Sequence, residues 1–363
     1  MRTLAQFAVL ATLVVTITTP PTPAQTAQPV PEQGKLAPTP PAPADKTPFP
    51  SQVMKTVVFI KADCEPSADD LAKLTPGALA TLTPEEIEKI RHPSFVGTGF
   101  LVAFPDSRLG NDGTFIYIVT NRHVVQPGIE DGKPRKVLNY SVYLNRRNSP
   151  GSEQTHLQIV SLGPDAPWIL PEDDPAVDLA VMSVNLPQTD WDYKTVPLDF
   201  FVSQELLDQK KVVEGDPIFF VGLFIQLSDF SSAGKVEPIL RTGTIAELPA
   251  NLEPTTLKRM GHIYLIEAHS FGGNSGSPVL VDVNKFTGPG YDYKFLGVVA
   301  GNIIENNDFT LQVTTDYRGA VRANSGISVV VPADEVKKML STERMQRLRD
   351  DAVAQFLKAR GKL

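Results

Sequence analysis

Short apolar runs separated by turn residues recur along most of the chain, and they constrain its fold more than any other feature. The runs have the length and composition of β-strands, and glycine, proline, asparagine or aspartate commonly lies between them. The strand candidates are 57–60, 97–104, 114–120, 137–144, 156–162, 179–184, 217–223, 239–246, 262–268, 278–283, 294–300 and 327–331. Because strands and helices do not alternate here, the pattern predicts an all-β fold of antiparallel barrels or a sandwich.

One segment interrupts this β pattern. Residues 65–94 contain two runs that start at Ser67 and Thr83, each followed by acidic residues, and Pro84 occupies the position after the second start. Serine and threonine are preferred helix N-caps, and proline is tolerated in the first turn. The sequence therefore predicts a helical insertion over residues 65–94.

The last part of the chain also has helical spacing. After Pro332 the residues mix charges with an apolar stripe, which predicts a C-terminal helix within 341–363. Its apolar residues include Met345, Leu348 and Phe356. The helix is expected either to cap the β domain or to mediate oligomer formation.

The N-terminus has the features of an export signal. Arg2 precedes the apolar run Leu4–Ile17, and prolines and small residues follow it. This predicts a signal peptide over 1–24 and a periplasmic or secreted protein, with an uncleaved anchor as the alternative. The apolar run is short for a membrane span, so no stable membrane insertion is expected after cleavage. The proline-rich residues 25–50 are expected to form a disordered linker before a domain at 51–340.

Charge and cysteine content exclude several functional classes. The formal net charge is -7 and no basic block occurs, so a nucleic-acid partner is not expected. Cys64 is the only cysteine, which excludes an intrachain disulfide and a cysteine-built metal site. The five histidines are scattered rather than spaced as metal ligands. We therefore expect neither a metal nor another cofactor.

A glycine-rich turn carries the first chemical signal. The residues Gly-Gly-Asn-Ser-Gly-Ser-Pro-Val occupy positions 272–279, directly before an apolar run. Glycines allow such a turn to aim successive backbone N–H groups at one point. Acyl transfer needs a hydroxyl nucleophile, here Ser275, beside such an oxyanion site. A glycine-rich hairpin without catalytic function is the alternative interpretation.

Two other residues can complete a catalytic arrangement with Ser275. A serine hydroxyl needs a general base, and the base needs an orienting acceptor. His123 lies at the end of an apolar strand candidate, and Asp178 lies just before another. Each residue alone also fits a structural role. Their occurrence together, in the order His, Asp, Ser, favours a catalytic triad.

With these residues the chain resembles the trypsin-like, chymotrypsin-fold serine endopeptidases over most of residues 95–340. The likeness is to the bacterial glutamyl endopeptidases and to the protease domains of the Deg/Htr branch. The motifs that carry it are Thr120–Val125, Asp178–Val181, Glu214–Gly222, Thr242–Ile245, Gly272–Val279, Phe295–Gly301 and Gly326–Pro332. The resemblance implies two antiparallel six-stranded β-barrels with the active site between them. Deg/Htr proteins carry peptide-binding PDZ domains after the protease, and none is expected here.

The resemblance also implies a role for each site residue. Ser275 would be the nucleophile, His123 the general base and acid, and Asp178 the residue that orients the histidine. The backbone N–H groups of Gly273 and Ser275 would form the oxyanion hole.

Three residues are candidates for the pocket that binds the substrate side chain. The residue six positions before the serine lies near the base of the primary pocket in this family, and here it is His269. A histidine there favours acidic side chains when protonated, or it is structural. Asn302 and Ser328 are candidates for the same pocket. Val299 stands where glutamyl endopeptidases have a histidine, so glutamate specificity is not expected.

The polar stretch 303–325, which follows the pocket candidate Asn302 and precedes Gly326, is expected to be a long loop. Loops of this length are uncommon in compact domains and are often functional. This loop is therefore expected either to switch the pocket by becoming ordered or to have no function.

These features predict an exported serine endopeptidase that cleaves protein or peptide substrates through an acyl-enzyme. The alternative is a protease-like binding or chaperone module that is inactive, or that needs an activating peptide or an oligomer. An α/β-hydrolase fits poorly, because its Gly-x-Ser-x-Gly elbow would require glycine at position 277, which is serine. Its triad order is also the reverse of the order found here.

Overall fold

The structure is a computed structural model that describes residues 48–110, 113–223, 234–285, 292–312 and 316–359. Side chains are described within these ranges except at 305–323. The predicted signal peptide and nearly all of the predicted linker lie outside the described residues, so both stay predictions.

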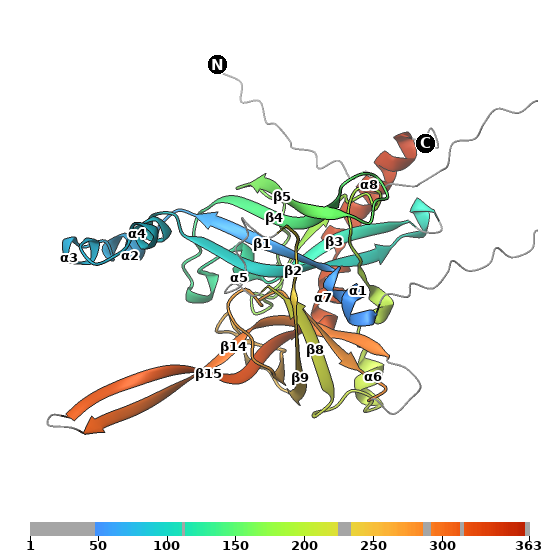
Figure 1. The fold of residues 1–363 in the computed structure, drawn as a ribbon. Coiled ribbons are helices and arrows are strands. Elements are labelled where there is room, and N and C mark those ends of the chain that lie inside the picture. The colour runs from blue at the N-terminus through green and yellow to red at the C-terminus, as the bar shows by residue number, and fades with distance from the viewer. Residues whose placement is uncertain (1–47, 111–112, 224–233, 286–291, 313–315, 360–363) are drawn as a thin grey trace, which may run out of the picture.

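Most of the described β-strands form two sheets that lie one above the other in Figure 1. The first sheet has the strand order β5-β4-β1-β2-β3-β6, with β7 added in parallel to β2. Its strands are β1 (Val57–Cys64), β2 (Ser94–Pro105), β3 (Thr114–Thr120), β4 (Val137–Arg147), β5 (Thr155–Gly163), β6 (Ala180–Val184) and β7 (Val196–Pro197). All the other pairings in this sheet are antiparallel.

The second sheet is a closed barrel with the strand order β12-β15-β14-β13-β8-β9. Its strands are β8 (Pro217–Gly222), β9 (Ile239–Glu247), β12 (Tyr264–Glu267), β13 (Pro278–Asp282), β14 (Tyr293–Gln312) and β15 (Asp316–Pro332). A separate two-stranded ribbon, β10 (Glu253–Pro254) with β11 (Met260–Gly261), lies between β9 and β12 in the chain.

The predicted all-β fold of two mainly antiparallel β units is therefore confirmed, with two differences from a pair of six-stranded barrels: the first sheet has a seventh strand, β7, and only one unit closes. The second half closes into a barrel, whereas the path of the first sheet ends at β5 and β6. The strand β6 is only five residues long. On its outer side, Val181 forms an isolated antiparallel bridge with Ile169, and in the described part of the chain no named strand continues the sheet there.

Short helices connect the strands, and two longer ones end the chain. The α-helices are α1 (Phe49–Met54), α2 (Ala68–Ala72), α3 (Pro76–Leu79), α4 (Pro84–Arg91), α5 (Arg122–Val125), α6 (Gln204–Asp208), α7 (Ala333–Leu340) and α8 (Glu343–Ala359). The single 3₁₀ turns are η1 (Ser107–Leu109), η2 (Ile129–Asp131) and η3 (Leu198–Phe200). Helix α1, just before β1, was not expected from the sequence.

The helical insertion is confirmed, and its ends are capped as the sequence predicts. The side chains of Ser67 and Thr83 accept hydrogen bonds from the backbone N–H groups of Asp70 and Glu86, and both acids bond back to form capping boxes. Helices α2, α3 and α4 project from the end of the first sheet (Figure 1). They form an arm between β1 and β2.

The predicted loop at 303–325 is wrong, because most of it is a β-hairpin. Strands β14 and β15 continue past the barrel and pair from Ile304–Asn324 out to Gln312–Asp316. This hairpin extends beyond the barrel as a second arm (Figure 1). Its polar composition hides the strands, because an arm away from the core needs no alternating apolar face.

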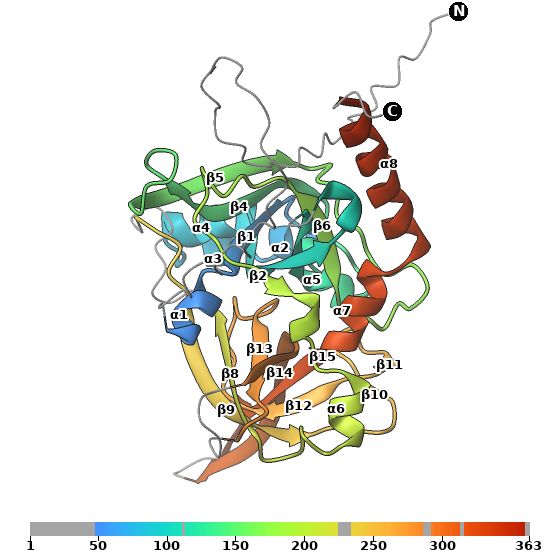
Figure 2. The same cartoon turned by 90° about the vertical axis from the view of Figure 1, so that its right-hand side faces the viewer.

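The C-terminal helices pack on the β domain. In Figure 2, α7 lies beside the junction of the two halves and α8 runs along the first sheet. Met345 and Val353 of α8 are buried in the core cluster that also contains residues of both sheets, whereas Leu348 is 48% exposed. The packing supports the capping role that the sequence left open.

Phe295 joins the two halves within this core. Its side chain is fully buried, and its ring centroid lies 5.2 Å from that of Phe100 in the first sheet and 4.6 Å from that of Phe201. Burial of such a ring is a large stabilising contribution, and its deletion leaves a cavity. Phe295 therefore contributes to holding the two halves together.

We expect Phe295→Ala to lower the free energy of unfolding by about 3–5 kcal/mol, because a buried phenylalanine side chain is replaced by a cavity. Urea denaturation followed by circular dichroism measures the loss. Leu348→Ala, at an exposed position of α8, is the control and should change stability by less than about 0.5 kcal/mol. Equal losses for the two variants would contradict the core position of Phe295.

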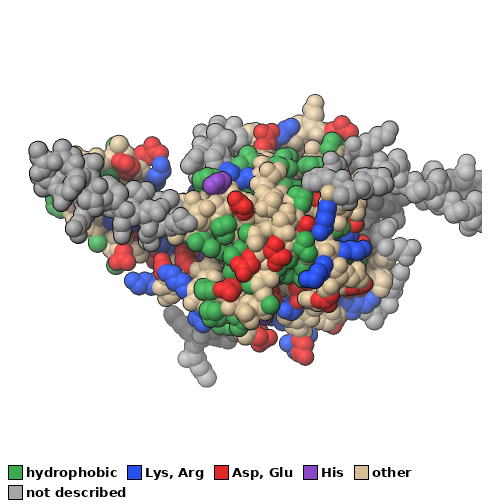
Figure 3. Space-filling view, turned by 90° about the horizontal axis from the view of Figure 1, so that it is seen from below, with side chains coloured by type: hydrophobic (Ala, Val, Ile, Leu, Met, Phe, Trp, Pro, Cys, Tyr) green, Lys and Arg blue, Asp and Glu red, His purple; other side chains and the backbone are tan. Residues whose placement is uncertain are grey.

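Within the described ranges, none of the helices combines the length and the apolar character needed to cross a bilayer. The face seen in Figure 3 carries acidic and basic side chains interspersed with apolar ones.

Candidate active site

His123 lies on α5, which begins directly after β3 ends at Thr120. The N-cap residue Asn121 is fully buried, and its Nδ2 donates to the backbone carbonyl of Asp178 over 2.8 Å. The backbone N–H of His123 donates to Asp178 Oδ1 over 3.1 Å. The imidazole Nδ1 lies 2.7 Å from Asp178 Oδ2. Two of the three predicted triad residues are therefore in direct contact.

The contact between Nδ1 and the carboxylate favours a proton on Nδ1 of His123 and a charged Asp178. The Asp178 side chain is 1% exposed and that of His123 is 21% exposed. Burial opposes the charge on each group, but their mutual attraction and hydrogen bonds hold the pKa of Asp178 below its usual value and that of His123 above its usual value. Glu130 on η2 adds to the upward shift of the His123 pKa. Nε2 is left as the ring atom available for proton transfer.

A hydroxyl group from the second half of the protein also reaches the aspartate. Thr256 Oγ1 donates to Asp178 Oδ2 over 2.7 Å. This is the same oxygen that faces His123 Nδ1. The carboxylate is thus held by donors from two different parts of the fold.

Ser275 sits in a turn that both halves of the protein hold in place. Its carbonyl accepts from the N–H of Thr98 on β2 over 2.8 Å. The next residue, Gly276, donates to the carbonyl of Val299 on β14 over 2.8 Å, and Asn274 Nδ2 donates to the carbonyl of Leu223 over 2.6 Å. Gly276 has φ 91° and no space for a Cβ, which would lie 1.7 Å from the Thr98 carbonyl oxygen. Only glycine fits at that position.

The histidine helix and the serine turn meet at one short stretch of β2. A Cβ added to Gly97 would lie 2.6 Å from Val124, the residue after His123, and 3.2 Å from the Ser275 carbonyl oxygen. The absence of a side chain at position 97 therefore lets α5 and the serine turn approach the same strand. The three predicted triad residues converge on one region between the two sheets.

The hydroxyl of Ser275 does not hydrogen-bond to His123 in the structure. Ser275 Oγ donates to the carbonyl of Ala300 on β14 over 3.2 Å. Catalytic hydrogen bonds are often long or misaligned in the absence of substrate. Transfer of the hydroxyl proton to Nε2 would need the Ser275 side chain to turn away from Ala300.

The two backbone N–H groups of the predicted oxyanion hole belong to Gly273 and Ser275. Gly273 has φ 92°, and its carbonyl accepts from Thr98 Oγ1 over 2.6 Å. Among the described residues, no acceptor hydrogen-bonds to the N–H of Gly273 or of Ser275. The two N–H groups are therefore candidates for binding an anionic oxygen of a ligand.

The three predicted pocket residues lie on neighbouring segments. The ring of His269 is exposed, and a Cβ added to Gly326 would lie 3.4 Å from its Cε1. Asn302 on β14 pairs with Ser328 on β15. Ser328 is fully buried, and its hydroxyl donates to the carbonyl of Ala268 over 2.7 Å. Its hydroxyl therefore supports the segment that carries His269.

Sequence reasoning missed Thr98 and Thr256. Thr98 lies within a predicted strand, where threonine is common, and Thr256 lies in a stretch with no motif. Asn274 lies within the serine motif, but the motif alone does not indicate that its side chain anchors the turn to Leu223. No local signal could have identified these residues, because their contacts join segments far apart in the chain.

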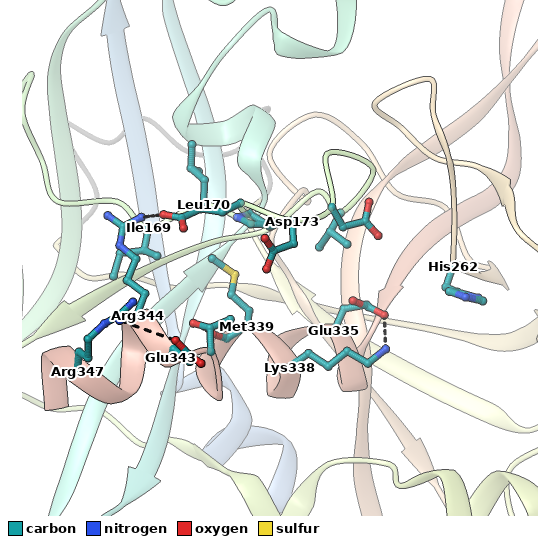
Figure 4. Close-up of a pocket in the computed structure, with 15 residues that line it drawn as sticks. Ile169, Leu170, Asp173, His262, Glu335, Lys338, Met339, Glu343, Arg344 and Arg347 are labelled. Atoms are coloured by element: carbon teal, nitrogen blue, oxygen red, sulfur yellow. Dashed lines mark hydrogen bonds and ion pairs between the residues drawn. The ribbon is translucent and has the colours of Figure 1, made fainter. Parts of the chain in front are cut away.

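A separate cavity of about 650 Å³ lies beside α7 and α8 (Figure 4). None of the triad residues lines it. Its charged side chains are largely paired with one another, as in Arg344 with Glu172 and Lys338 with Glu335. Among the residues that the structure describes, no cluster of three His, Cys, Asp or Glu side chains is placed to hold a metal ion.

Comparisons with known proteins identify the fold family. A family model for the trypsin-like peptidase domain matches residues 97–288, which is more than half of the 363-residue chain. None of the curated proteins matches the sequence.

Several solved structures are similar to the chain, all at low identity. Deg5 is 17% identical with a TM-score of 0.39, and the match covers 79% of this chain and 88% of that one. The MamO protease domain from Magnetospirillum magneticum is 14% identical with a TM-score of 0.38, covering 80% and 98%. The HtrA-type protease AlgW with decapeptide is 14% identical with a TM-score of 0.39, covering 80% and 65%. On the match of the family model over residues 97–288, this chain belongs to the trypsin-like peptidase family.

Proposed function

We propose that the protein is an exported serine endopeptidase that cleaves protein or peptide substrates through an acyl-enzyme. The observation that carries this proposal is the buried His123–Asp178 pair, with Nδ1 and Oδ2 2.7 Å apart, beside a serine turn with available N–H groups. A hydroxyl, a base with an oriented ring and an anion site are the parts that acyl transfer needs.

Each residue has a defined step in the proposed mechanism. Ser275 Oγ attacks the scissile carbonyl carbon while His123 Nε2 takes the hydroxyl proton. The carbonyl oxygen becomes an oxyanion that accepts from the N–H groups of Gly273 and Ser275. His123 then gives the proton to the leaving amine, and the C–N bond breaks. Water repeats the sequence on the acyl-enzyme and releases the acid.

Asp178 supports these steps without taking the proton. Its carboxylate stabilises the imidazolium that forms on His123 and keeps the proton on Nδ1 in the resting state. General-base catalysis contributes about 10²–10⁴-fold, and one oxyanion-hole donor about 10²–10³-fold.

The primary pocket is proposed to contain His269, with Asn302 and Ser328 on the adjoining strands. An exposed imidazole near Gly326 can donate to an acidic or polar substrate side chain. Cleavage mapping on a proteome-derived peptide library tests this directly. Enrichment of acidic or polar residues before the cut supports the assignment, and enrichment of large apolar residues contradicts it.

The proposed activity is tested with purified full-length protein on unfolded casein and with a fluorophosphonate probe. Turnover together with covalent labelling supports the endopeptidase. Peptides are added in a parallel series, because a protease that needs activation would be labelled only in their presence. Neither turnover nor labelling in any condition would contradict the proposal.

The second candidate function is a protease-like binding or chaperone module. The observation that favours it is the hydrogen bond of Ser275 Oγ to the Ala300 carbonyl instead of to His123. A module of this kind would suppress aggregation of unfolded casein without cleaving it. The same casein assay therefore separates the two functions.

The pH dependence of the reaction provides a further prediction. The pKa of His123 is raised above its ordinary value of 6.5, because Asp178 and Glu130 outweigh the effect of burial. The general base must be neutral, so activity is lost as pH falls through this raised value. We expect the acid limb of kcat/KM against pH to have an apparent pKa above 6.5. An apparent pKa below 6.5 for the acid limb would contradict the pairing of His123 with Asp178.

Export is proposed from the charged start and apolar run at residues 1–24. Fractionation of cells that express the full chain, followed by N-terminal sequencing, tests it. A mature start near residue 25 in the periplasm or medium supports export, and an unprocessed protein in the cytoplasm contradicts it.

A further inference from the structure

We propose that Thr256 is a positioning residue for catalysis, carried by a strap (residues 253–261) that crosses from the barrel to the first half of the protein. The proposal rests on the proposed protease function and adds a residue that no motif in the sequence identifies. Its basis is the hydrogen bond from Thr256 Oγ1 to Asp178 Oδ2 over 2.7 Å.

The strap is a small ordered ribbon rather than an open loop. Its strands β10 and β11 pair at Glu253–Gly261 and Pro254–Met260. The turn between them is closed by a hydrogen bond from the Thr255 N–H to the Arg259 carbonyl over 2.8 Å. Thr256 therefore has a fixed place on a defined backbone.

Two contacts hold the strap against the first half of the protein. Lys258 Nζ donates to Asp131 Oδ1 on η2 over 2.7 Å. At Gly261, an added Cβ would lie 3.1 Å from the Cβ of Ala176, which belongs to the segment leading to Asp178. The strap thus lies against η2, which follows His123 in the chain, and against the segment that precedes Asp178.

The rotamer of Thr256 is fixed by its two branches. A Cβ added to Gly301 on β14 would lie 3.1 Å from the Thr256 methyl group, so the methyl packs against that glycine. The hydroxyl points at Asp178. Since threonine is stiff at χ1, the contact of one branch fixes the direction of the other.

The consequence is a carboxylate that has little freedom to rotate. Asp178 Oδ1 accepts from the His123 backbone N–H, and Oδ2 faces both Thr256 Oγ1 and His123 Nδ1. A fixed carboxylate holds the imidazole plane, and the plane decides where Nε2 points. Thr256 acts on the reaction through this chain of contacts and touches no reacting atom.

The test compares three variants of the full-length protein. Thr256→Val keeps the shape and removes the hydroxyl, and Thr256→Ser keeps the hydroxyl. Thr255→Val is the matched control, because the Thr255 hydroxyl is buried and has no hydrogen-bond partner in the described part of the chain. We expect Thr256→Val to lower kcat by about 10- to 100-fold with little change in KM. Thr256→Ser keeps the hydroxyl but loses the methyl that packs on Gly301, so its kcat should lie between those of Thr256→Val and the wild type. Thr255→Val should have the kcat of the wild type.

A second readout follows the imidazole itself and does not need turnover. The hydroxyl withdraws charge from Asp178, so its removal leaves a more negative carboxylate facing the ring. Glu130, the other charged group acting on His123, is unchanged. NMR titration of His123 in Thr256→Val should therefore give a higher pKa than in the wild type, with a displaced low-field Nδ1 proton resonance.

The outcomes separate this inference from the proposed function. Full activity in Thr256→Val, or an equal loss in Thr255→Val, would overturn the positioning role while leaving the protease intact. A wild-type protein that neither labels nor cleaves would defeat the protease proposal. In that case the NMR titration still decides, and identical His123 resonances in wild type and Thr256→Val would overturn the role of Thr256.

Discussion

Replacement of Ser275 by alanine is expected to lower kcat by about 10⁶-fold and to abolish labelling by a fluorophosphonate. The reason is that the hydroxyl is the only group that the mechanism places in a covalent bond with substrate. The fold should be retained, because the turn is held by backbone bonds from Ser275 and Gly276 and by the Asn274 side chain. Stopped assays on casein and in-gel labelling measure the effect, and thermal melting checks the fold.

Ser277 provides a control within the same turn. Its hydroxyl is fully buried, and no partner for it occurs in the described part of the chain. Ser277→Ala should therefore keep both labelling and turnover near the wild-type level. Labelling of Ser275→Ala at the wild-type level would place the nucleophile elsewhere and contradict the triad assignment.

The elements that could be predicted from the sequence are those whose signals are local. Strands such as β3 and β13 consist of apolar runs bounded by turn residues, and the structure has them at the predicted positions. The capping boxes at Ser67 and Thr83 depend on residues within one helical turn. In these cases the residues that decide the structure are neighbours in the chain.

The elements that could not be predicted depend on surroundings that the local sequence does not record. The sequence predicts a loop at 303–325, where β14 and β15 extend as a long hairpin. The strands of this hairpin do not show the alternation of apolar and polar residues that a strand packed on a core has. The first sheet does not close into a barrel, because its end strands β5 and β6 do not pair with each other. A pattern of apolar residues gives the strands but not whether the last strand meets the first.

The candidate site divides in the same way. His123, Asp178 and Ser275 stand in recognisable motifs, and the structure brings the first two into contact and the third beside the same strand. The order of the motifs along the chain predicted their association. Thr256 reaches Asp178 only because the strap from the barrel crosses to the first half of the protein. Such a contact is a property of the folded protein, so structure was needed to find it.

Replacement of Asp178 by asparagine is expected to lower kcat by about 10⁴-fold, although the substituted side chain has nearly the same shape. An amide at this position can present its NH₂ group to the ring, which favours the wrong tautomer of His123. The pKa of His123 should also fall, because the largest of the influences that raise it is the Asp178 charge. The residual activity should therefore have an acid limb at lower pH than the wild type.

This combination distinguishes an orienting carboxylate from a merely structural one. Asp173→Asn, an exposed carboxylate in the same segment, is the control and should leave both kcat and the acid limb unchanged. A structural role for Asp178 would reduce the amount of folded protein without moving the limb. A variant that keeps the wild-type pH profile and loses activity only in proportion to its folded fraction would contradict the assignment. A large loss of kcat with a limb displaced to lower pH requires that Asp178 acts through the imidazole of His123.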